Sequence, residues 1–430
     1  MDYKETIEYL YNQLPVYQKV GGSAYKEGLD NSLRLDEYFS HPHRKYKTIH
    51  VAGTNGKGSV SHLTAAILQE AGYKVGLYTS PHLIDFKERI RVNGEKISED
   101  YVVNFVEKHK AFFEPIEPSF FELTMMMAFM YFAYMGVDVA VIEVGLGGRL
   151  DSTNIISPDL SIITNISFDH MQFLGNTLPK IAAEKAGIIK KDIPVIIGEA
   201  EGEVRQVFEE TAERTGAPII FAEDEKIIHS SLKTASGWLF DTKYHLHLKG
   251  ELSGYAQIKN AATVLCTIKE LQKLGYVIPS KAVYSGFAYV NELTGLMGRW
   301  QIIQEINPKI VCDTGHNAAG MKYIVEQLTT ERYQTLHFIL GMVNDKDISN
   351  ILTMLPKKAI YYFTKASIPR SRNERELEAL ARKQGLTGYS YPTVAEAVQA
   401  AKDWAAPNDF IFIGGSNFIV ADALEYFGYQ

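Results

Sequence analysis

The segment that most constrains the fold of this chain is a glycine-rich stretch between a short β-type run and a helical pattern. Residues 53–59 read Gly-Thr-Asn-Gly-Lys-Gly-Ser and follow the β-type run at residues 48–52. Apolar residues then recur at helical spacing between residues 60 and 71. In this order of strand, turn and helix, backbone N–H groups and the positive helix end surround phosphate. The stretch therefore predicts a phosphate-binding loop.

Two side chains of this loop have specific expected roles. Lys57 is expected to reach the outer phosphates, and the Ser59 hydroxyl to bind Mg²⁺. Compared with the general phosphate-loop pattern, the lysine is flanked by two glycines and the loop is one residue shorter. A glycine-rich β–α turn without a ligand is the alternative. The order of strand, loop and helix favours the phosphate loop.

Size and charge narrow the class of protein. A chain of 430 residues is long enough for two domains, because single cores stop growing near about 250–300 residues. The hydrophobic share of 46% and the charged share of 22% are ordinary for a globular protein. The formal net charge of -7 argues against a nucleic acid as the main partner.

The cysteines and the apolar runs indicate a cytoplasmic protein. Cys266 and Cys312 fit a reducing compartment and offer neither a disulfide framework nor a zinc pattern. The first residues lack the order of a signal peptide. The longest apolar run, residues 123–137, is too short to span a bilayer and predicts a buried helix whose methionines fill the core. We expect a cytoplasmic monomer without a membrane partner.

Strand and helix patterns alternate along most of the chain. Apolar runs such as residues 137–144 and 161–165 are typical of parallel strands that are covered on both faces. Their alternation with helices predicts an α/β fold, with a doubly wound, mostly parallel sheet around the phosphate loop. Between residues 226 and 249 the pattern changes to a period of two, which predicts antiparallel strands.

Glycines cluster around residues 295–298, and we place a domain boundary there. We expect an ATP-binding domain with substrate loops over residues 1–296, and a smaller Rossmann-like α/β domain over residues 297–430. The polar, glycine-bearing stretch at residues 21–28 predicts a mobile loop and is a candidate substrate lid.

Polar side chains recur where the expected strands of the larger domain end. Open α/β sheets bind ligands beyond the carboxyl ends of their strands, so these groups are expected to converge although they are far apart in the sequence. They are Ser59, Ser80, His82, Glu143, Asp169 and His170.

Glu143 is the most informative of these residues. A carboxylate inside an otherwise apolar strand is costly unless it is paired or bound to a metal. Mg²⁺ takes oxygen ligands and completes its shell with water and phosphate oxygens, so it would suit this carboxylate. An ion pair with an arginine such as Arg149 is the alternative. For Asp169 and His170, a structural role is the alternative.

Several motifs taken together resemble folylpolyglutamate synthase and dihydrofolate synthase, of the Mur ligase superfamily. The resemblance covers nearly the whole chain. Its motifs are the phosphate loop at 53–59, Thr-Ser-Pro-His-Leu at 79–83, Glu-Arg-Ile-Arg at 88–91, Phe-Glu at 121–122, the segment 143–154, Asp-His at 169–170, Glu-Lys-Ala-Gly at 184–187, Gly-Arg at 298–299 and Asp-Thr-Gly-His-Asn at 313–317.

The resemblance implies a role for each motif. It implies catalytic roles for Lys57, Lys185 and His316, and Lys185 matches a lysine that family members carbamylate. The nucleotide is expected to contact Thr54, Asn55, Gly56, Lys57, Gly58, Ser59, Asn260, Arg299 and Asp313. The magnesium shell is expected to include Ser59, Ser80, Glu143 and His170. The pterin substrate is expected to contact Gly28, Leu29, Asp30, His82, Phe121, Glu122, Leu150, Asp151 and Ser152.

The activity implied by the resemblance is an ATP-driven amide ligation with Mg²⁺ at two sites. The γ-phosphoryl group would pass to a carboxylate of dihydropteroate or of a folate, and the amine of L-glutamate would then displace phosphate. Closure of the smaller domain would exclude water. Two alternatives are a peptidoglycan Mur ligase and a non-catalytic nucleotide switch. The roughly 50 residues before the phosphate loop leave little room for the first domain that peptidoglycan ligases carry.

Overall fold

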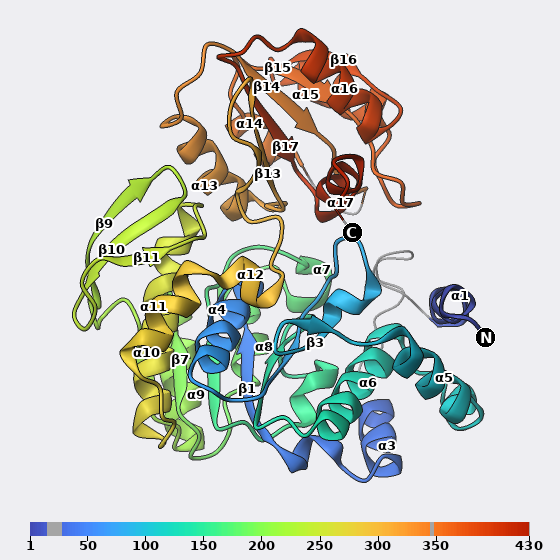
Figure 1. The fold of residues 1–430 in the computed structure, drawn as a ribbon, viewed down its shortest axis with the longest axis vertical. Helices are drawn as coiled ribbons and strands as arrows, with labels where there is room; N and C mark the ends of the chain where they lie inside the picture. Colours follow the sequence, from blue (N-terminus) through green and yellow to red (C-terminus); the bar gives the residue numbers. More distant parts are fainter. Residues whose placement is uncertain (15–27, 345–347, 430) are drawn as a thin grey trace. The chain divides into compact units, whose positions relative to one another are not determined.

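The computed structural model describes residues 1–14, 28–344 and 348–429 and divides them into two compact units (Figure 1). The larger unit comprises Met1–His82, Phe86–Glu251 and Gln257–Leu296, and the smaller unit comprises Leu83–Asp85, Leu252–Ala256 and Met297–Gln430. The candidate lid falls almost entirely on residues 15–27, outside the described ranges, and stays a prediction. No helix in the described part of the chain has the length and apolar character needed to cross a bilayer.

The larger unit is built on an eight-stranded sheet with the order β4-β3-β2-β5-β1-β6-β7-β8. The pairings from β2 to β8 are parallel, and β3 and β4 add an antiparallel edge. The strands are β1 (Lys47–Ala52), β2 (Val75–Tyr78), β3 (Ile90–Val92), β4 (Glu95–Lys96), β5 (Val139–Glu143), β6 (Leu160–Ile163), β7 (Val195–Ile197) and β8 (Ile219–Phe221). A separate antiparallel sheet contains β9 (Ile228–Thr234), β10 (Gly237–Thr242) and β11 (Leu248–Gly250), as the period of two predicted.

The helices of the larger unit connect and cover these strands. The α-helices are α1 (Tyr3–Gln13), α3 (Asp30–Tyr38), α4 (Lys57–Glu70), α5 (Glu99–Phe113), α6 (Phe120–Met135), α7 (Met171–Leu174), α8 (Leu178–Ala186), α9 (Gly202–Thr215), α10 (Ala256–Lys273), α11 (Ser280–Ala288) and α12 (Val290–Thr294). Helix α8 begins at Leu178 and ends at Ala186, because the Thr177 side chain caps its first turn and Gly187 caps its end. Pro179 lies in that first turn, where proline is well tolerated.

The smaller unit has a six-stranded sheet with the order β12-β13-β17-β14-β15-β16. All of its pairings are parallel except that of β12 with β13. Its elements are β12 (Gln301–Gln304), β13 (Lys309–Asp313), α13 (Ala318–Leu328), β14 (Leu336–Leu340), α14 (Ser349–Met354), β15 (Ile360–Phe363), α15 (Glu374–Lys383), β16 (Thr387–Ser390), α16 (Val394–Trp404), β17 (Phe410–Gly414) and α17 (Asn417–Tyr426). The expected fold class, a doubly wound sheet domain plus a smaller α/β domain, is confirmed.

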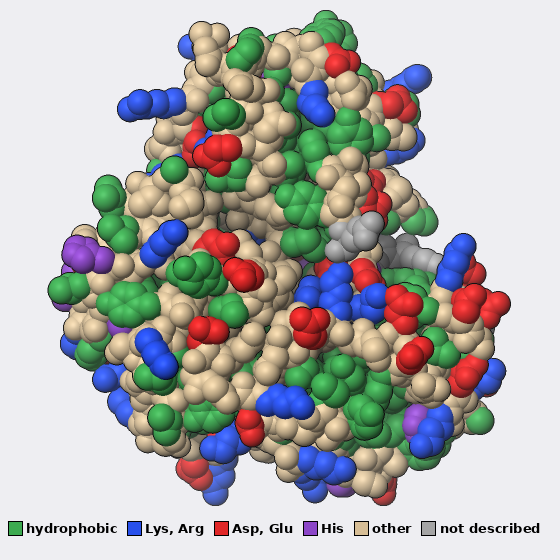
Figure 2. All heavy atoms as spheres, in the orientation of Figure 1, with side chains coloured by type: hydrophobic (Ala, Val, Ile, Leu, Met, Phe, Trp, Pro, Cys, Tyr) green, Lys and Arg blue, Asp and Glu red, His purple; other side chains and the backbone are tan. Residues whose placement is uncertain are grey.

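Charged side chains of both signs are intermingled on the surface shown in Figure 2. Many form exposed pairs, such as Arg205, whose guanidinium lies 2.7 Å from Asp224 and 2.8 Å from Glu209. Exposed ion pairs of this kind add little stability, typically below about 1 kcal/mol. The stability of the fold therefore comes mainly from its buried apolar clusters.

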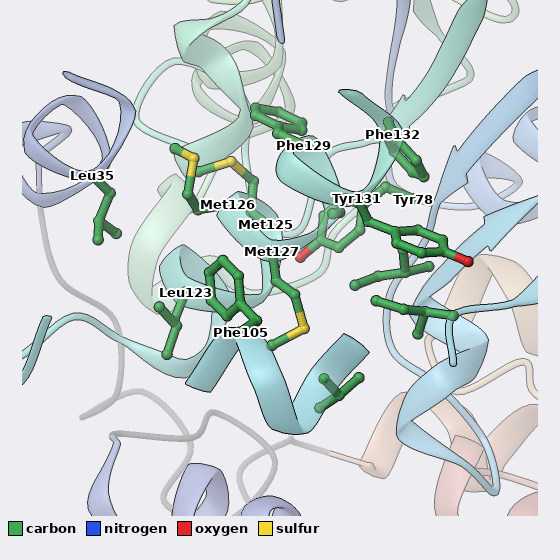
Figure 3. Packing of buried hydrophobic residues seen from close by; sticks show 14 of the residues in the cluster. Leu35, Tyr78, Phe105, Leu123, Met125, Met126, Met127, Phe129, Tyr131 and Phe132 are labelled. Atoms are coloured by element: carbon green, nitrogen blue, oxygen red, sulfur yellow. The ribbon is translucent and has the colours of Figure 1, made fainter. Parts of the chain in front are cut away.

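The methionine-rich helix α6 lies in one of these clusters (Figure 3). Met125, Met126 and Met127 are fully buried and pack among aromatic and aliphatic side chains from α3, α5 and β2. Every residue from Glu122 to Phe129 is buried, which explains why this part of the helix is apolar on almost all sides. The prediction that these methionines fill the core is confirmed.

Helix α11 packs directly against α4, the helix that follows the phosphate loop (Figure 1). At the contact is Gly286, where a Cβ atom would lie 2.8 Å from the backbone N and Cα atoms of Ile67. The two helix backbones can approach this closely only because the residue has no side chain. Nothing in the sequence pattern indicates this contact.

We expect Gly286→Ala to lower the free energy of unfolding by about 1–3 kcal/mol, because the new methyl group would press on the backbone of α4. Helix propensity alone would change stability in the opposite direction, by up to about 1 kcal/mol in favour of alanine. Ser285→Ala, at a half-buried position of the same helix, is the control and should change stability little. Chemical denaturation of both variants measures the difference, and a stabilised Gly286→Ala would contradict the proposed close contact.

Candidate active site

Parallel pairing brings the ends of four strands together at one edge of the large sheet. In the order β2-β5-β1-β6, Val51 pairs with Glu143 and Ala52 pairs with Ile163. The segments that follow these strands therefore start side by side. They contain the phosphate loop, Ser80 and the pair Asp169–His170, and Glu143 is the last residue of β5.

The phosphate loop runs from the end of β1 into α4, and its glycines are required by its geometry. Gly53 has a φ of +143°, and a Cβ atom there would overlap the Thr164 hydroxyl. Gly56 has a φ of +85° and precedes the first turn of α4, and a Cβ atom there would lie 2.3 Å from Asn260 Oδ1. The first turn of α4 exposes backbone N–H groups that suit an anion.

The segment after β6 holds the phosphate loop in place through several hydrogen bonds. The Thr54 backbone N–H donates to the Asn165 carbonyl at 2.9 Å, and the Asn55 N–H donates to Asn165 Oδ1 at 3.0 Å. Asn165 Nδ2 and the Thr164 hydroxyl both donate to the Asn55 carbonyl. Sequence reasoning placed Asn165 at the end of a strand and missed this function, for which an isolated asparagine gives no signal.

Two lysines converge on one backbone carbonyl at the start of the loop. Lys57 Nζ donates to the Gly53 carbonyl at 3.1 Å, and Lys185 Nζ, from α8, donates to the same oxygen at 2.9 Å. Lys185 is buried, and its burial together with the nearby Lys57 cation lowers its pKa to about 7, although Asp169 and Asp151 act in the opposite direction. At neutral pH a large share of the Lys185 side chains is therefore uncharged.

Three of the four expected metal ligands take part in two separate hydrogen bonds. The Glu143 carboxylate accepts a bond from the Ser80 backbone N–H at 3.0 Å, which joins the ends of β5 and β2. The Ser59 hydroxyl accepts a bond from Gln257 Nε2 at 3.2 Å. His170 follows Asp169 and has a left-handed backbone conformation with a φ of +49°. These side chains are brought to the same sheet edge.

Gln257 is a site residue that the sequence analysis missed. It lies on α10 and connects two predicted residues, because its Nε2 donates to Ser59 and its Oε1 accepts from Asn260 Nδ2 at 2.9 Å. Asn260 in turn lies against Gly56. A glutamine in a long helix has no distinctive pattern, so only the packing of α10 reveals it.

Arg149 was the alternative partner proposed for Glu143. Its guanidinium forms an ion pair with Glu184 on α8 at 2.9 Å. The Arg149 backbone N–H also donates to the Glu184 carbonyl at 2.7 Å. The segment after β5 is thus attached to the helix that carries Lys185.

The residues expected to contact a pterin fall into two groups. The first group lies at the start of α6, where Glu122 accepts bonds from the Ser119 backbone N–H at 2.6 Å and, at 3.4 Å, from Asn31 of α3. Glu122 therefore caps its helix and contacts α3, which follows Gly28 and Leu29 and begins at Asp30. Phe121 lies against Gly145 and Tyr78.

The second group surrounds Asp151, with Leu150 and Ser152 as its neighbours in sequence. Asp151 is buried, accepts a bond from the Leu146 backbone N–H at 2.8 Å and caps the turn at Ser152–Ile155. Burial raises the pKa of this carboxyl, while its hydrogen bonds act in the opposite direction. The hydrogen bonds of Asp151 to Leu146 and to the turn at Ser152–Ile155 fix the loop that contains them.

His82 is the central member of a hydrogen-bonded chain. Arg89 Nε donates to His82 Nδ1 at 2.7 Å, and His82 Nε2 lies 2.9 Å from the Tyr11 hydroxyl. Burial, followed by the Arg89 charge, holds the pKa of His82 well below its usual range. The neutral ring therefore carries its proton on Nε2 and donates to Tyr11.

The smaller unit carries the remaining predicted residues at the end of β13. Asp313 accepts bonds from the Trp300 and Gly315 backbone N–H groups, each at 2.7 Å. Burial raises the pKa of Asp313, and the Arg299 charge acts in the opposite direction. His316 Nδ1 lies 3.0 Å from the Thr314 carbonyl. Arg299, Asp313 and His316 thus belong to one loop cluster within the smaller unit.

Comparison with known proteins shows which domain families match this chain. The Mur ligase middle domain matches residues 51–268, and the Mur ligase glutamate ligase domain matches residues 298–417. The chain is 33% identical to the dihydrofolate synthase/folylpolyglutamate synthase of Bacillus subtilis (strain 168), over 92% of this chain and 94% of that protein.

Two solved structures are similar over almost their full length. Escherichia coli FolC in complex with DHPP and ADP is 30% identical, with a TM-score of 0.85, over 99% of this chain and 97% of that chain. A bifunctional folylpolyglutamate synthase/dihydrofolate synthase with Mn, AMPPNP and L-glutamate bound is 26% identical, with a TM-score of 0.84, over 99% of this chain and 98% of that chain.

The bonds of Gln257 generate a prediction about nucleotide binding. Gln257→Leu removes the partners of Ser59 and Asn260, so we expect the Kd for ADP to rise by about 3–10-fold, as for the loss of one or two hydrogen bonds. Gln272→Leu is the matched control, because Gln272 lies on the same helix and bonds the Ile278 carbonyl instead. Calorimetric titration with ADP gives both constants, and equal affinities in the two variants would contradict the role of Gln257.

Proposed function

The chain belongs to the dihydrofolate synthase/folylpolyglutamate synthase family of Mur ligases, and from this premise we propose how its own residues carry out the reaction. It is an ATP-dependent ligase that forms an amide bond with glutamate. We assign roles in this reaction to particular residues because the phosphate loop, Glu143 and two lysines converge at one sheet edge.

In the first step, an oxygen of the substrate carboxylate attacks the γ-phosphorus of ATP, and ADP leaves. The N–H groups at the start of α4 and the Lys57 ammonium hold the phosphates and offset the charge that develops on them. Lys57 now donates to carbonyls of its own loop, so it would exchange these bonds for phosphate oxygens. In the second step, the glutamate amine attacks the activated carbonyl carbon. The C–N bond forms, the bond from that carbon to the phosphate oxygen breaks, phosphate leaves and the amine nitrogen gives up a proton to water.

The donor set at the sheet edge fits a divalent cation. Glu143 offers a buried carboxylate beside Ser80, and Ser59 offers a second hydroxyl. Oxygen ligands with open positions for phosphate and water suit Mg²⁺. We assign Ser59, Ser80, Glu143 and His170 to this cation, whose bound form would supply positive charge next to the phosphates.

The acceptor is proposed to be dihydropteroate, a folate with a glutamate tail, or both in turn. The side chains around Glu122 and Asp151 hold the loops that would contact its pterin ring. Asn260, Arg299 and Asp313 are assigned to the nucleotide, and His316 to a catalytic role close to the phosphates, by their match to the family motifs.

Lys185 is proposed to be carbamylated. Its neutral amine nitrogen attacks the carbon of CO₂, an N–C bond forms and one proton passes to water, which leaves a carbamate anion. The lowered pKa supports this step, because only the uncharged amine is a nucleophile. The product replaces a cation beside Lys57 by an anion that can approach a second divalent cation.

A substrate panel tests the activity. With ATP, Mg²⁺ and L-glutamate present, either dihydropteroate or a reduced folate should gain the mass of one glutamate residue. Lys57→Ala should lower kcat by about 100-fold or more, because it removes a charge that acts on the transferred phosphoryl group. Lys249→Ala, at an exposed position, is the control. Mass spectrometry identifies the product; no glutamate added to either acid, or full turnover by Lys57→Ala, would contradict the proposal.

The carbamate on Lys185 should depend on pH in a defined direction. About half of the Lys185 amines are neutral at the pKa of about 7, so at fixed dissolved CO₂ the modification should decline as the pH falls below that value. A carbon-13 carbamate signal, measured by NMR with labelled CO₂, should appear in the wild type and in Lys180→Arg, an exposed control on the same helix. Its persistence in Lys185→Arg would show that another amine is modified.

A further inference from the structure

Three side chains that commonly bind metals gather where α3 ends, away from the site described above. Asp36 lies in the last turn of α3, and His41 and His43 follow it. His41 Nδ1 is 2.6 Å from Asp36 Oδ2, and His43 Nε2 is 3.3 Å from the same oxygen. One ligand atom from each residue lies within 4.8 Å of the other two. Among the described residues, this is the only group of three such side chains that meets that distance.

The local backbone holds the two histidines against the carboxylate. His41 has a left-handed conformation with a φ of +53°, and its N–H donates to the Asp36 carbonyl at 2.9 Å. Pro42 comes next and begins a short 3₁₀ turn, so the chain folds back towards Asp36. The His43 ring lies 5.9 Å from the Phe129 ring of α6. The three side chains are thus fixed by the fold and by packing against α6.

One buried oxygen atom of this cluster accepts no hydrogen bond from the described residues. Asp36 is 3% exposed, and its buried Oδ1 atom accepts no hydrogen bond in the described structure, although His43 Nε2 lies 3.3 Å away. A buried acceptor without a hydrogen bond costs about 1–3 kcal/mol. A cation next to the carboxylate would remove this cost. The unsatisfied oxygen is therefore a second indication of a ligand, independent of the clustering.

We propose that Asp36, His41 and His43 form a binding site for a divalent transition-metal cation such as Zn²⁺, with water as the fourth ligand. Two imidazoles and one carboxylate are a ligand set that Zn²⁺ takes in a tetrahedral site. Tetrahedral ligands at about 2.0–2.1 Å from the metal lie roughly 3.3 Å apart. The three ligand atoms observed here all lie within 4.8 Å of one another, so side-chain rearrangement would bring them to that spacing. The His41 side chain is 38% exposed, which leaves the site open to water and to the metal.

The position of the site indicates a structural role. Residues 41–43 precede the start of β1, whereas the phosphate loop follows its end. The six residues of β1 separate the two places by roughly 20 Å. At its other end, α3 reaches Glu122 through Asn31, beside the residues expected to bind the pterin. A bound metal would anchor α3 to the segment that leads into β1.

The test measures Zn²⁺ uptake by the full chain. Protein is stripped with a chelator, and Zn²⁺ is then added in the presence of excess Mg²⁺, which occupies the Mg²⁺ site. After gel filtration, elemental analysis should find about one Zn²⁺ per chain. The melting temperature should rise on addition of Zn²⁺, because a ligand that binds only the folded state stabilises it. Co²⁺ in place of Zn²⁺ should give the visible absorption of a tetrahedral site.

Two variants and one control make the outcome decisive. His41→Gln, at a half-exposed position, and His43→Gln should each lose the bound Zn²⁺ and the shift in melting temperature. His247→Gln is the control, because His247 forms a surface pair with Asp241 at 3.4 Å without a third ligand. Circular dichroism establishes that each variant folds. Failure of the wild type to take up Zn²⁺ would overturn the proposal, as would full uptake by a folded His41→Gln.

Discussion

The carbonyl oxygen of Gly53 is the point on which the arrangement of the active site depends. It accepts hydrogen bonds from Lys57 in the phosphate loop and from Lys185 in α8. The pairing of β1 between β5 and β6 fixes the position of this oxygen. One acceptor thus brings two cations close together in a buried place, and their mutual repulsion helps to make Lys185 a weak base.

The sequence predicts the parts of this arrangement that follow from local patterns. The phosphate loop has a glycine spacing that few other structures need, and Glu143 is recognisable as a carboxylate in an apolar strand. The α/β fold follows from the alternation of strand and helix patterns. The roles of Lys185, Asn260 and the smaller unit's residues came from resemblance to a family, because single residues in helices and loops have no pattern of their own.

Other parts could not be predicted, because they depend on contacts between segments that are distant in sequence. Gln257 bonds Ser59 from a helix near the far end of the larger unit's sequence, and Asn165 supports a loop that belongs to another strand. The contact of Gly286 with α4 is of the same kind. Such residues are identified only when the packing of α10, α11 and the segment after β6 is known.

The burial of α4 has a consequence for how binding energy is used. Every residue from Gly58 to Leu68 is buried, so the helix is enclosed by the sheet on one side and by α11 and α12 on others. Helix α4 therefore loses little conformational entropy when an anion binds at its first turn. The affinity for phosphate is therefore not reduced by an entropy cost of ordering α4. Movements that ligand binding causes must arise in the connecting loops rather than in this helix.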